Sequence, residues 1–196
     1  MDKKVKLIIG IAGASGVIYG IRLLEALKTL DQVESHLVMT STARMNIGLE
    51  TDLDAKEVEA LADVVHKDTN LAASIASGSF RADGMIVAAC AMKTLSDIVH
   101  SRADSLLTRA ADVILKEQRR LVIMPRETPL HTGHCKLMYE ACQLGAIIAP
   151  PMPAFYTKPG TIDDIVNHSV GRVLDLFDLE TGLVTRWQGP NDTQAK

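Results

Sequence analysis

The sequence lacks the features of several large protein classes. Its 21 Lys and Arg against 24 Asp and Glu give a net charge of −3, so it has no basic excess of the kind that a general nucleic-acid binder carries. No apolar run reaches the roughly 18 residues that a membrane span requires. The start "MDKKVKLIIGIAG" has no convincing cleavage segment of a signal peptide. We therefore expect neither a nucleic acid nor a membrane as partner.

Cysteine is also scarce. The three cysteines, Cys90, Cys135 and Cys142, form no C-x-x-C pair and are odd in number. Reduced thiols and a cytoplasmic location are the natural expectation for such a set. Cys135 and Cys142 are seven residues apart, which favours one buried helix face.

Aromatic residues are few, and their placement is uneven. Only seven of 196 residues are Phe, Trp or Tyr, yet Phe155 and Tyr156 are adjacent in "PPMPAFYTKPG", which also holds four of the seven prolines. Such a stretch is either a packed surface turn or a preformed wall for a flat ligand.

Apolar segments of two periodicities alternate along the chain. Short β-branched runs typical of buried parallel strands are separated by amphipathic helical patterns. Strands are expected at 5–13, 33–40, 84–92, 121–125 and 146–150, and helices at 16–30, 55–66, 104–120, 133–145 and 161–177. This alternation predicts an α/β fold, a three-layer parallel sheet with helices on both faces. We expect a single domain over residues 1–189 and a flexible tail at 190–196.

Ligands of such sheets bind beyond the carboxyl ends of the strands, so these ends locate the candidate site. The first strand is followed by the glycine-rich segment 10–16, which allows close approach of a phosphate. Thr40 follows the second strand, where a dinucleotide fold would carry an acid, so a mononucleotide fits better. Lys93 and Thr94 follow the third. A tight turn and a helix start without any ligand explain these features equally well.

Two further groups of charged or ligating side chains stand out. Arg126 and Glu127 are fixed between two prolines, and arginine suits bidentate contact with phosphate; a surface ion pair is the alternative. Arg109 and Lys116 are seven residues apart and so share one helix face, and Arg172 lies among apolar neighbours. All three side chains could equally be exposed to solvent without a ligand. His131, His134 and Cys135 lack a convincing fourth ligand, so no metal is expected.

Five blocks of the sequence together resemble the flavin prenyltransferases, the UbiX/Pad family once described as aromatic-acid decarboxylases. The blocks are "GIAGASGVIYGIRLLEAL", "HLVMTSTA", "SGSFRADGMIVAACAMKTL", "RAADVILKEQRRLVIMPRETPL" and "PPMPAFYTKP". The ending "RWQG" is similar to the branch associated with phenolic-acid decarboxylases. The resemblance implies a Rossmann-like (flavodoxin-like) fold and a homododecamer with sites at subunit junctions. It also implies a metal-independent transfer of a dimethylallyl group from dimethylallyl phosphate to N5 and C6 of reduced FMN. The product, prenylated FMN, serves a UbiD-type decarboxylase.

The resemblance also assigns roles to residues. It implies FMN-binding residues Gly13, Ala14, Ser15, Thr40, Ala91, Met92, Lys93, Thr94, Arg109 and Arg126. It implies prenyl-phosphate contacts from Lys116, Arg126, Tyr156 and Arg172, with Trp187 near the prenyl group and Phe155 anchoring the loop. Catalytic roles fall to Ser15, Glu50, Lys116 and Glu127. The family usually has Ser at the position of Ala91, so a hydroxyl beside the flavin is missing here.

Two other functions fit parts of the sequence. An FMN-dependent cysteine-type decarboxylase has a related fold, but the segment "AACAMK" lacks the Asn of that group. A non-catalytic FMN-binding subunit would not need the second phosphate site that Lys116, Arg126, Tyr156 and Arg172 imply.

Overall fold

A computed structural model of the chain describes residues 4–189. The chain forms two compact units that divide between Pro151 and Met152, and each is described by itself. The single domain expected over residues 1–189 stays a prediction, and the tail expected at 190–196 lies outside the described residues.

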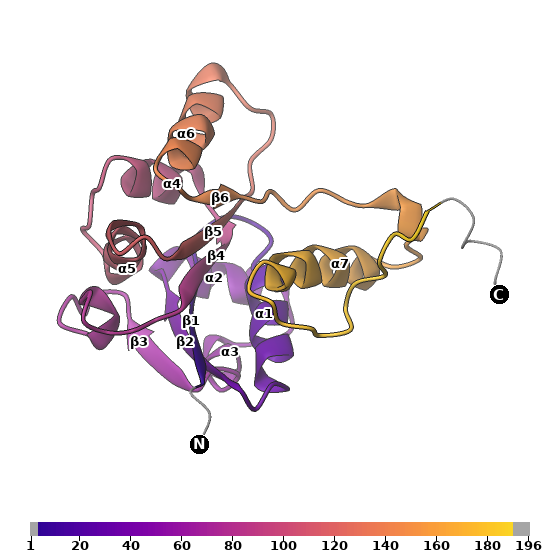
Figure 1. Cartoon of the computed structure of the whole chain (residues 1–196), viewed down its shortest axis with the longest axis horizontal. Helices are drawn as coiled ribbons and strands as arrows, with labels where there is room; N and C mark the ends of the chain where they lie inside the picture. Colours follow the sequence, from indigo (N-terminus) through magenta and orange to yellow (C-terminus); the bar gives the residue numbers. More distant parts are fainter. Residues whose placement is uncertain (1–3, 190–196) are drawn as a thin grey trace. The chain divides into compact units, whose positions relative to one another are not determined.

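The first unit is built on one six-stranded sheet (Figure 1). Every recorded strand pairing is parallel, and the strand order is β3-β2-β1-β4-β5-β6, the order of a doubly wound Rossmann sheet. The strands are β1 (Val5–Ile11), β2 (Val33–Met39), β3 (Val64–Lys67), β4 (Gly84–Cys90), β5 (Arg120–Pro125) and β6 (Ile147–Ile148). The α/β fold expected from the alternating pattern is confirmed.

Helices cover both faces of this sheet (Figure 1). They are α1 (Ile18–Lys28), α2 (Ser41–Glu50), α3 (Ala55–Glu59), α4 (Met92–Val99), α5 (Leu106–Lys116) and α6 (Thr132–Gln143), with a short 3₁₀ helix η1 (Ser74–Ala76). Alternate residues of β1 serve the two faces, because side chains alternate along a strand. Gly10 faces Leu107 of α5, whereas Ile11 faces Gly20 of α1.

Small residues let α1 pack closely on the centre of the sheet. A Cβ atom at Gly20 would lie 2.6 Å from the carbonyl oxygen of Ala88 and 2.7 Å from the side chain of Ile11. All seven residues of β4 are buried, and Ala88 and Ala89 keep its helix-facing surface small. The strand that ends at the candidate site is therefore held rigidly on both faces.

The sequence prediction was wrong between the second and third expected strands. The helix expected at 55–66 ends at Glu59, and the following residues form β3 at the sheet edge. β3 alternates half-buried and exposed residues, so its apolar content was too low to distinguish it from a helix. Helix α2 was not predicted, because only Ala43 and Ile47 of its ten residues are buried and its apolar periodicity is weak.

The second unit contains a short 3₁₀ helix η2 (Phe155–Thr157), helix α7 (Ile162–Asp175) and the segment that follows it. Thr161 and Asp164 cap α7 reciprocally: Asp164 N–H donates to Thr161 Oγ1 at 3.1 Å, and Thr161 N–H donates to Asp164 Oδ2 at 2.9 Å. Gly171 has no room for a side chain, because a Cβ there would lie 2.4 Å from Val184 Cγ2. The segment after α7 therefore packs back along the helix.

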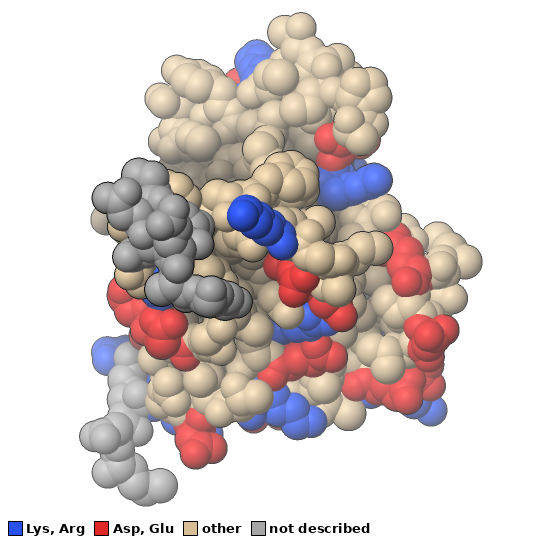
Figure 2. All heavy atoms as spheres, turned by 90° about the vertical axis from the view of Figure 1, so that its right-hand side faces the viewer, with Lys and Arg blue, Asp and Glu red and all other residues tan. Residues whose placement is uncertain are grey.

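Charge on the surface is mixed in sign. In Figure 2 acidic and basic side chains lie interspersed on the face shown, without a broad basic patch. Among residues 4–189, none of the helices has both the length and the apolar character to cross a bilayer.

A chain of polar side chains crosses the face of strands β1 to β3. Lys6 pairs with Glu34 at 2.9 Å, Glu34 contacts His36 Nε2 at 2.8 Å, and His36 Nδ1 lies 3.0 Å from His66 Nε2. His36 is only 3% exposed and packs edge-on against Phe80. Burial and the neighbouring His36 lower the pKa of His66 below its ordinary value.

This histidine pair should make the fold less stable in mild acid. Because folding lowers the pKa of His66, the unfolded chain binds more protons, and stability is lost as the pH falls below about 6.5. We expect the urea concentration at the midpoint of unfolding to be lower at pH 5.5 than at pH 7.5. In His66→Gln this difference between the two midpoints should be smaller. His168, whose pKa is also lowered, contributes in the same direction, so the difference should shrink without vanishing. His100→Gln, at an exposed histidine, is the control; an unchanged difference in His66→Gln would contradict the assignment.

Candidate functional site

A cavity of about 460 Å³ lies at the carboxyl ends of β1 and β4. These are the neighbouring strands at which the strand order reverses, the point where doubly wound sheets bind ligands. Its lining brings together five of the predicted FMN-binding residues, namely Gly13, Thr40, Ala91, Lys93 and Thr94. Hydroxyl side chains of Ser41, Thr42, Ser105 and Thr108 and the carboxylates Asp68, Asp97 and Asp104 complete its polar wall.

The start of helix α4 offers donors to this cavity. Ala91 is the N-cap residue and makes no side-chain capping bond, so the first N–H groups of α4 are not satisfied by a cap. Lys93 on the first turn pairs with Asp97 at 2.7 Å and has an 86% exposed side chain. An anionic group in the cavity can therefore accept hydrogen bonds from these backbone N–H groups and pair with Lys93.

The glycine-rich turn is held by helix α2, which the sequence analysis missed. Asn46 Nδ2 donates to the carbonyl oxygens of Gly13 and Ala14, both at 3.3 Å. Glu50 Oε2 accepts from Gly16 N–H at 2.7 Å and from Val17 N–H at 3.2 Å. Glu50, predicted as catalytic, thus caps the N-terminus of α1 from outside the helix.

Gly13 and Thr40 also have identifiable structural tasks. A Cβ at Gly13 would lie 2.6 Å from the side chain of Thr42, so only glycine fits there without displacing a wall of the cavity. Thr40 Oγ1 accepts from Ala43 N–H at 3.1 Å and caps α2. Ser15, on the same glycine-rich turn as Gly13, is exposed.

Arg126 and Glu127 follow β5, at the same edge of the sheet. Arg126 N–H donates to the carbonyl oxygen of Cys90 at 3.1 Å, which places Arg126 next to Ala91. Both side chains are exposed, and Glu127 Oε1 accepts from the N–H of Thr128 at 3.0 Å. The two side chains are available at the carboxyl edge, as predicted.

Arg109 and Lys116 are not brought to the cavity within this chain. Arg109 donates through Nε to Ala76 O at 3.1 Å and through Nη1 to Asp112 at 2.9 Å. Lys116 ends α5 and pairs with Glu117. Because the start of α5 lines the cavity and each helical residue rises 1.5 Å, Lys116 lies about 12 Å further along the helix axis than Thr108.

The second unit collects the remaining predicted residues. Tyr156 lies edge-on to Trp187, with ring centroids 5.5 Å apart, and its hydroxyl lies 2.9 Å from His168 Nε2. Arg172 pairs with Asp175 at 2.6 Å. Phe155 is 73% exposed in this chain, and its expected role in anchoring the loop stays a prediction.

Three residues around this group were missed. Asp175 accepts hydrogen bonds from Arg172 and from Nη1 and Nη2 of Arg186. Arg186 also pairs with Glu180 at 2.7 Å. Burial opposes ionisation of Asp175, but the bonds from Arg186 and Arg172 outweigh it and lower the pKa of this carboxyl. His168 could have been found by its position one helical turn before Arg172; Arg186 gave no comparable signal.

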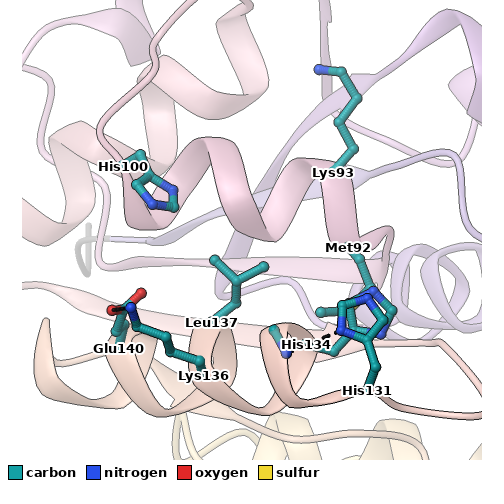
Figure 3. A pocket seen from close by; sticks show the side chains of 9 residues that line it. Met92, Lys93, His100, His131, His134, Lys136, Leu137 and Glu140 are labelled. Atoms are coloured by element: carbon teal, nitrogen blue, oxygen red, sulfur yellow. Dashed lines mark hydrogen bonds and ion pairs between the residues drawn. The ribbon is translucent and has the colours of Figure 1, made fainter.

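A second cavity, also of about 460 Å³, lies between α4 and α6 (Figure 3). The predicted FMN ligand Met92 lines this cavity and not the first. The rings of His131 and His134 are in contact there, tilted by 33° with centroids 3.6 Å apart. Within residues 4–189 no three His, Cys, Asp or Glu are grouped as metal ligands. The buried face expected for Cys135 and Cys142 was wrong, because both are exposed.

Restoring the hydroxyl at position 91 should stabilise the protein. Ala91 has extended backbone angles, φ −72° and ψ 149°, which suit a serine N-cap. Ala91→Ser should therefore raise the free energy of unfolding by about 1 kcal/mol, measured by urea denaturation.

Ala91→Val, which adds bulk without an acceptor, is the matched control and should not stabilise. Equal stability of the serine variant and the parent would show that the first N–H groups of α4 already have other partners.

The comparisons agree with this geometry. The family model described as "Flavoprotein" matches residues 1–173. "Flavin prenyltransferase UbiX" of Salmonella typhimurium is 58% identical over 186 residues, covering 94% of this chain and 98% of the relative. A UbiX protein crystallised with FMN and dimethylallyl pyrophosphate is 51% identical, with a TM-score of 0.93, covering 95% of this chain and 99% of that one. A dodecameric FMN-dependent UbiX-like decarboxylase from Escherichia coli O157:H7 is 53% identical, also at 0.93, covering 94% and 100%. The chain therefore belongs to the flavin prenyltransferase family of flavoproteins.

Proposed function

We propose that the protein transfers a dimethylallyl group from dimethylallyl phosphate to N5 and C6 of reduced FMN and so makes prenylated FMN. The product is the cofactor of a UbiD-type aromatic-acid decarboxylase. The observation that carries the proposal is the match at 51% identity over 95% of the chain to a protein whose structure holds both FMN and a dimethylallyl diphosphate. Family membership, the polar cavity at the reversal of strand order and the exposed cations at its edge support it. We place this activity in the cytoplasm, where the three unpaired cysteines fit a reducing environment.

The residues of the first cavity fit a flavin mononucleotide. A volume of about 460 Å³ lies within the range of cofactor sites. The turn formed by Gly13, Ala14 and Ser15 would lie against the ring system, and the uncapped start of α4 would donate to the ligand. Because Glu50 already occupies the N–H groups of Gly16 and Val17, the glycine turn has fewer donors left for a phosphate than α4. The bound flavin supplies the nucleophilic positions that accept the five-carbon group.

The prenyl phosphate requires positive charge. When the allylic C–O bond breaks, its electron pair goes to the phosphate, and the five-carbon fragment becomes cationic. Lys116, Arg126 and Arg172 would stabilise the phosphate electrostatically, and Tyr156 would donate a hydrogen bond. Trp187 offers an aromatic face to the cationic fragment. Glu127, exposed beside Arg126, would accept the proton that leaves C6.

A second copy of the chain completes this set of cations. Lys116 lies along α5, away from its own cavity, so we assign it to the site of a neighbouring subunit in a homo-oligomer. The UbiX-like decarboxylase from Escherichia coli O157:H7 is dodecameric, and we propose the same assembly here.

Incubation with reduced FMN and dimethylallyl phosphate tests the function directly. Mass spectrometry of the extracted flavin should show the gain of one five-carbon unit. Heat-inactivated protein is the control. Unchanged FMN after verified binding of both ligands would refute the transferase and favour a non-catalytic FMN-binding subunit.

Mixed oligomers test whether Lys116 acts across a subunit boundary. Lys116→Ala should keep bound flavin, and Lys116→Ala and Arg126→Ala, each assayed at saturating FMN, should lose about 100-fold or more in turnover, on the order expected for removing one electrostatic catalyst. Co-assembly of the two variants in equal amounts should restore about one quarter of the sites, because random mixing pairs an intact Lys116 with an intact Arg126 at that frequency. Activity that stays at the level of the separate variants would place both residues in the same subunit's site.

A further inference from the structure

Tyr156 contacts two side chains of its own unit, His168 and Trp187. Its ring lies edge-on to His168, with centroids 5.7 Å apart at 82°, and edge-on to Trp187, with centroids 5.5 Å apart at 77°. Its hydroxyl lies 2.9 Å from His168 Nε2. Tyr156 is 43% exposed and Trp187 is 58% exposed, so the group is open to a ligand.

The direction of this hydrogen bond determines what Tyr156 can offer a ligand. A tyrosine hydroxyl has one proton. If Tyr156 donates that proton to His168, it presents only lone pairs to a phosphate, which are repulsive. If His168 donates through Nε2–H to the Tyr156 oxygen, the O–H proton is free to point at the phosphate. An acceptor-only phosphate ester dianion therefore selects the second arrangement.

The surroundings favour a neutral His168 that acts as a donor. Arg172 lies one turn further along α7, and Asp175 holds its guanidinium at 2.6 Å. Burial, followed by the charge of Arg172, lowers the pKa of His168, and Asp175 opposes this. The positive charge at this site therefore comes from Arg172, whereas His168 contributes one N–H group at a fixed position.

We propose that His168 is a positioning residue, which donates a hydrogen bond to the Tyr156 oxygen and thereby directs the Tyr156 hydroxyl proton to the departing phosphate. No proton is transferred in this role. As the allylic C–O bond breaks and charge collects on the phosphate, the Tyr156 bond to the phosphate strengthens, and the His168 bond strengthens with it. The inference rests on the proposed function, since it concerns the same phosphate.

Steady-state kinetics of four variants test the proposal. His168→Leu should lower kcat for dimethylallyl phosphate about tenfold, the size expected for one hydrogen bond to a charged group, with flavin binding unchanged. His168→Gln, whose amide can reach the position of Nε2, should recover to within about threefold of the parent. Tyr156→Phe should lose at least as much as His168→Leu. Tyr156→Phe/His168→Leu should be no worse than Tyr156→Phe alone, because the histidine acts only through the hydroxyl.

Three outcomes would overturn the assignment. The first is an equal kcat in His168→Leu and the parent. The second is a double variant whose losses are additive, because a merely structural role of His168 would produce additive losses. If His168→Leu does not fold, His168→Asn replaces it. The asparagine amide is too short to reach Tyr156, so this variant should lose activity, whereas His168→Gln should keep it. Equal activity of the Asn and Gln variants would refute the role. His100→Leu, at an exposed histidine on the first unit, is the control for histidine loss. A parent protein that forms no prenylated flavin overturns the proposed function as well.

Discussion

The reversal of strand order between β1 and β4 is the constraint on which the site depends. Both strands run in parallel and end at the same edge, but the chain leaves β1 toward α1 on one face, whereas α5 covers the other. No connection fills the space between their ends, so a crevice opens there without requiring any special side chain. The residues that follow the two strands, Gly13 and Ala91, become walls of the cavity because of this topology.

The crevice keeps its shape because close packing fixes both of its walls. Gly20 allows α1 to touch the backbone of β4, so any larger residue would push the helix and the adjoining turn away from the strand. Asn46 and Glu50 of α2 then hold that turn from the other side. Glu50 also has an electrostatic consequence, since its carboxylate neutralises the donors at the start of α1 and leaves those of α4 for a ligand. The start of α4 is therefore the better placed of the two helix N-termini to donate to an anion.

The sequence predicted the buried strands and the long amphipathic helices well, because their apolar periodicity reflects burial on the sheet. Helix α2 and strand β3 were not predicted, because few of their residues are buried and their apolar periodicity is therefore weak. The candidate FMN residues were predicted from strand ends and family motifs, and five of them meet at one cavity. Met92 points to the second cavity instead, because adjacent residues of a helix lie on different faces. Asp175 and Arg186 were missed because their importance lies in contacts with other side chains, which no local pattern encodes. His168 was missed although its position one helical turn before Arg172 gave a signal.

The three cations predicted to bind the prenyl phosphate belong to different parts of the chain. Arg126 lies at the edge of the sheet beside the cavity, Lys116 lies near the opposite end of α5, and Arg172 belongs to the second unit, where Asp175 holds it. Several like charges brought together before a ligand arrives would repel one another and destabilise the fold. Pairing Lys116 with Glu117 and Arg172 with Asp175 reduces that cost within the chain.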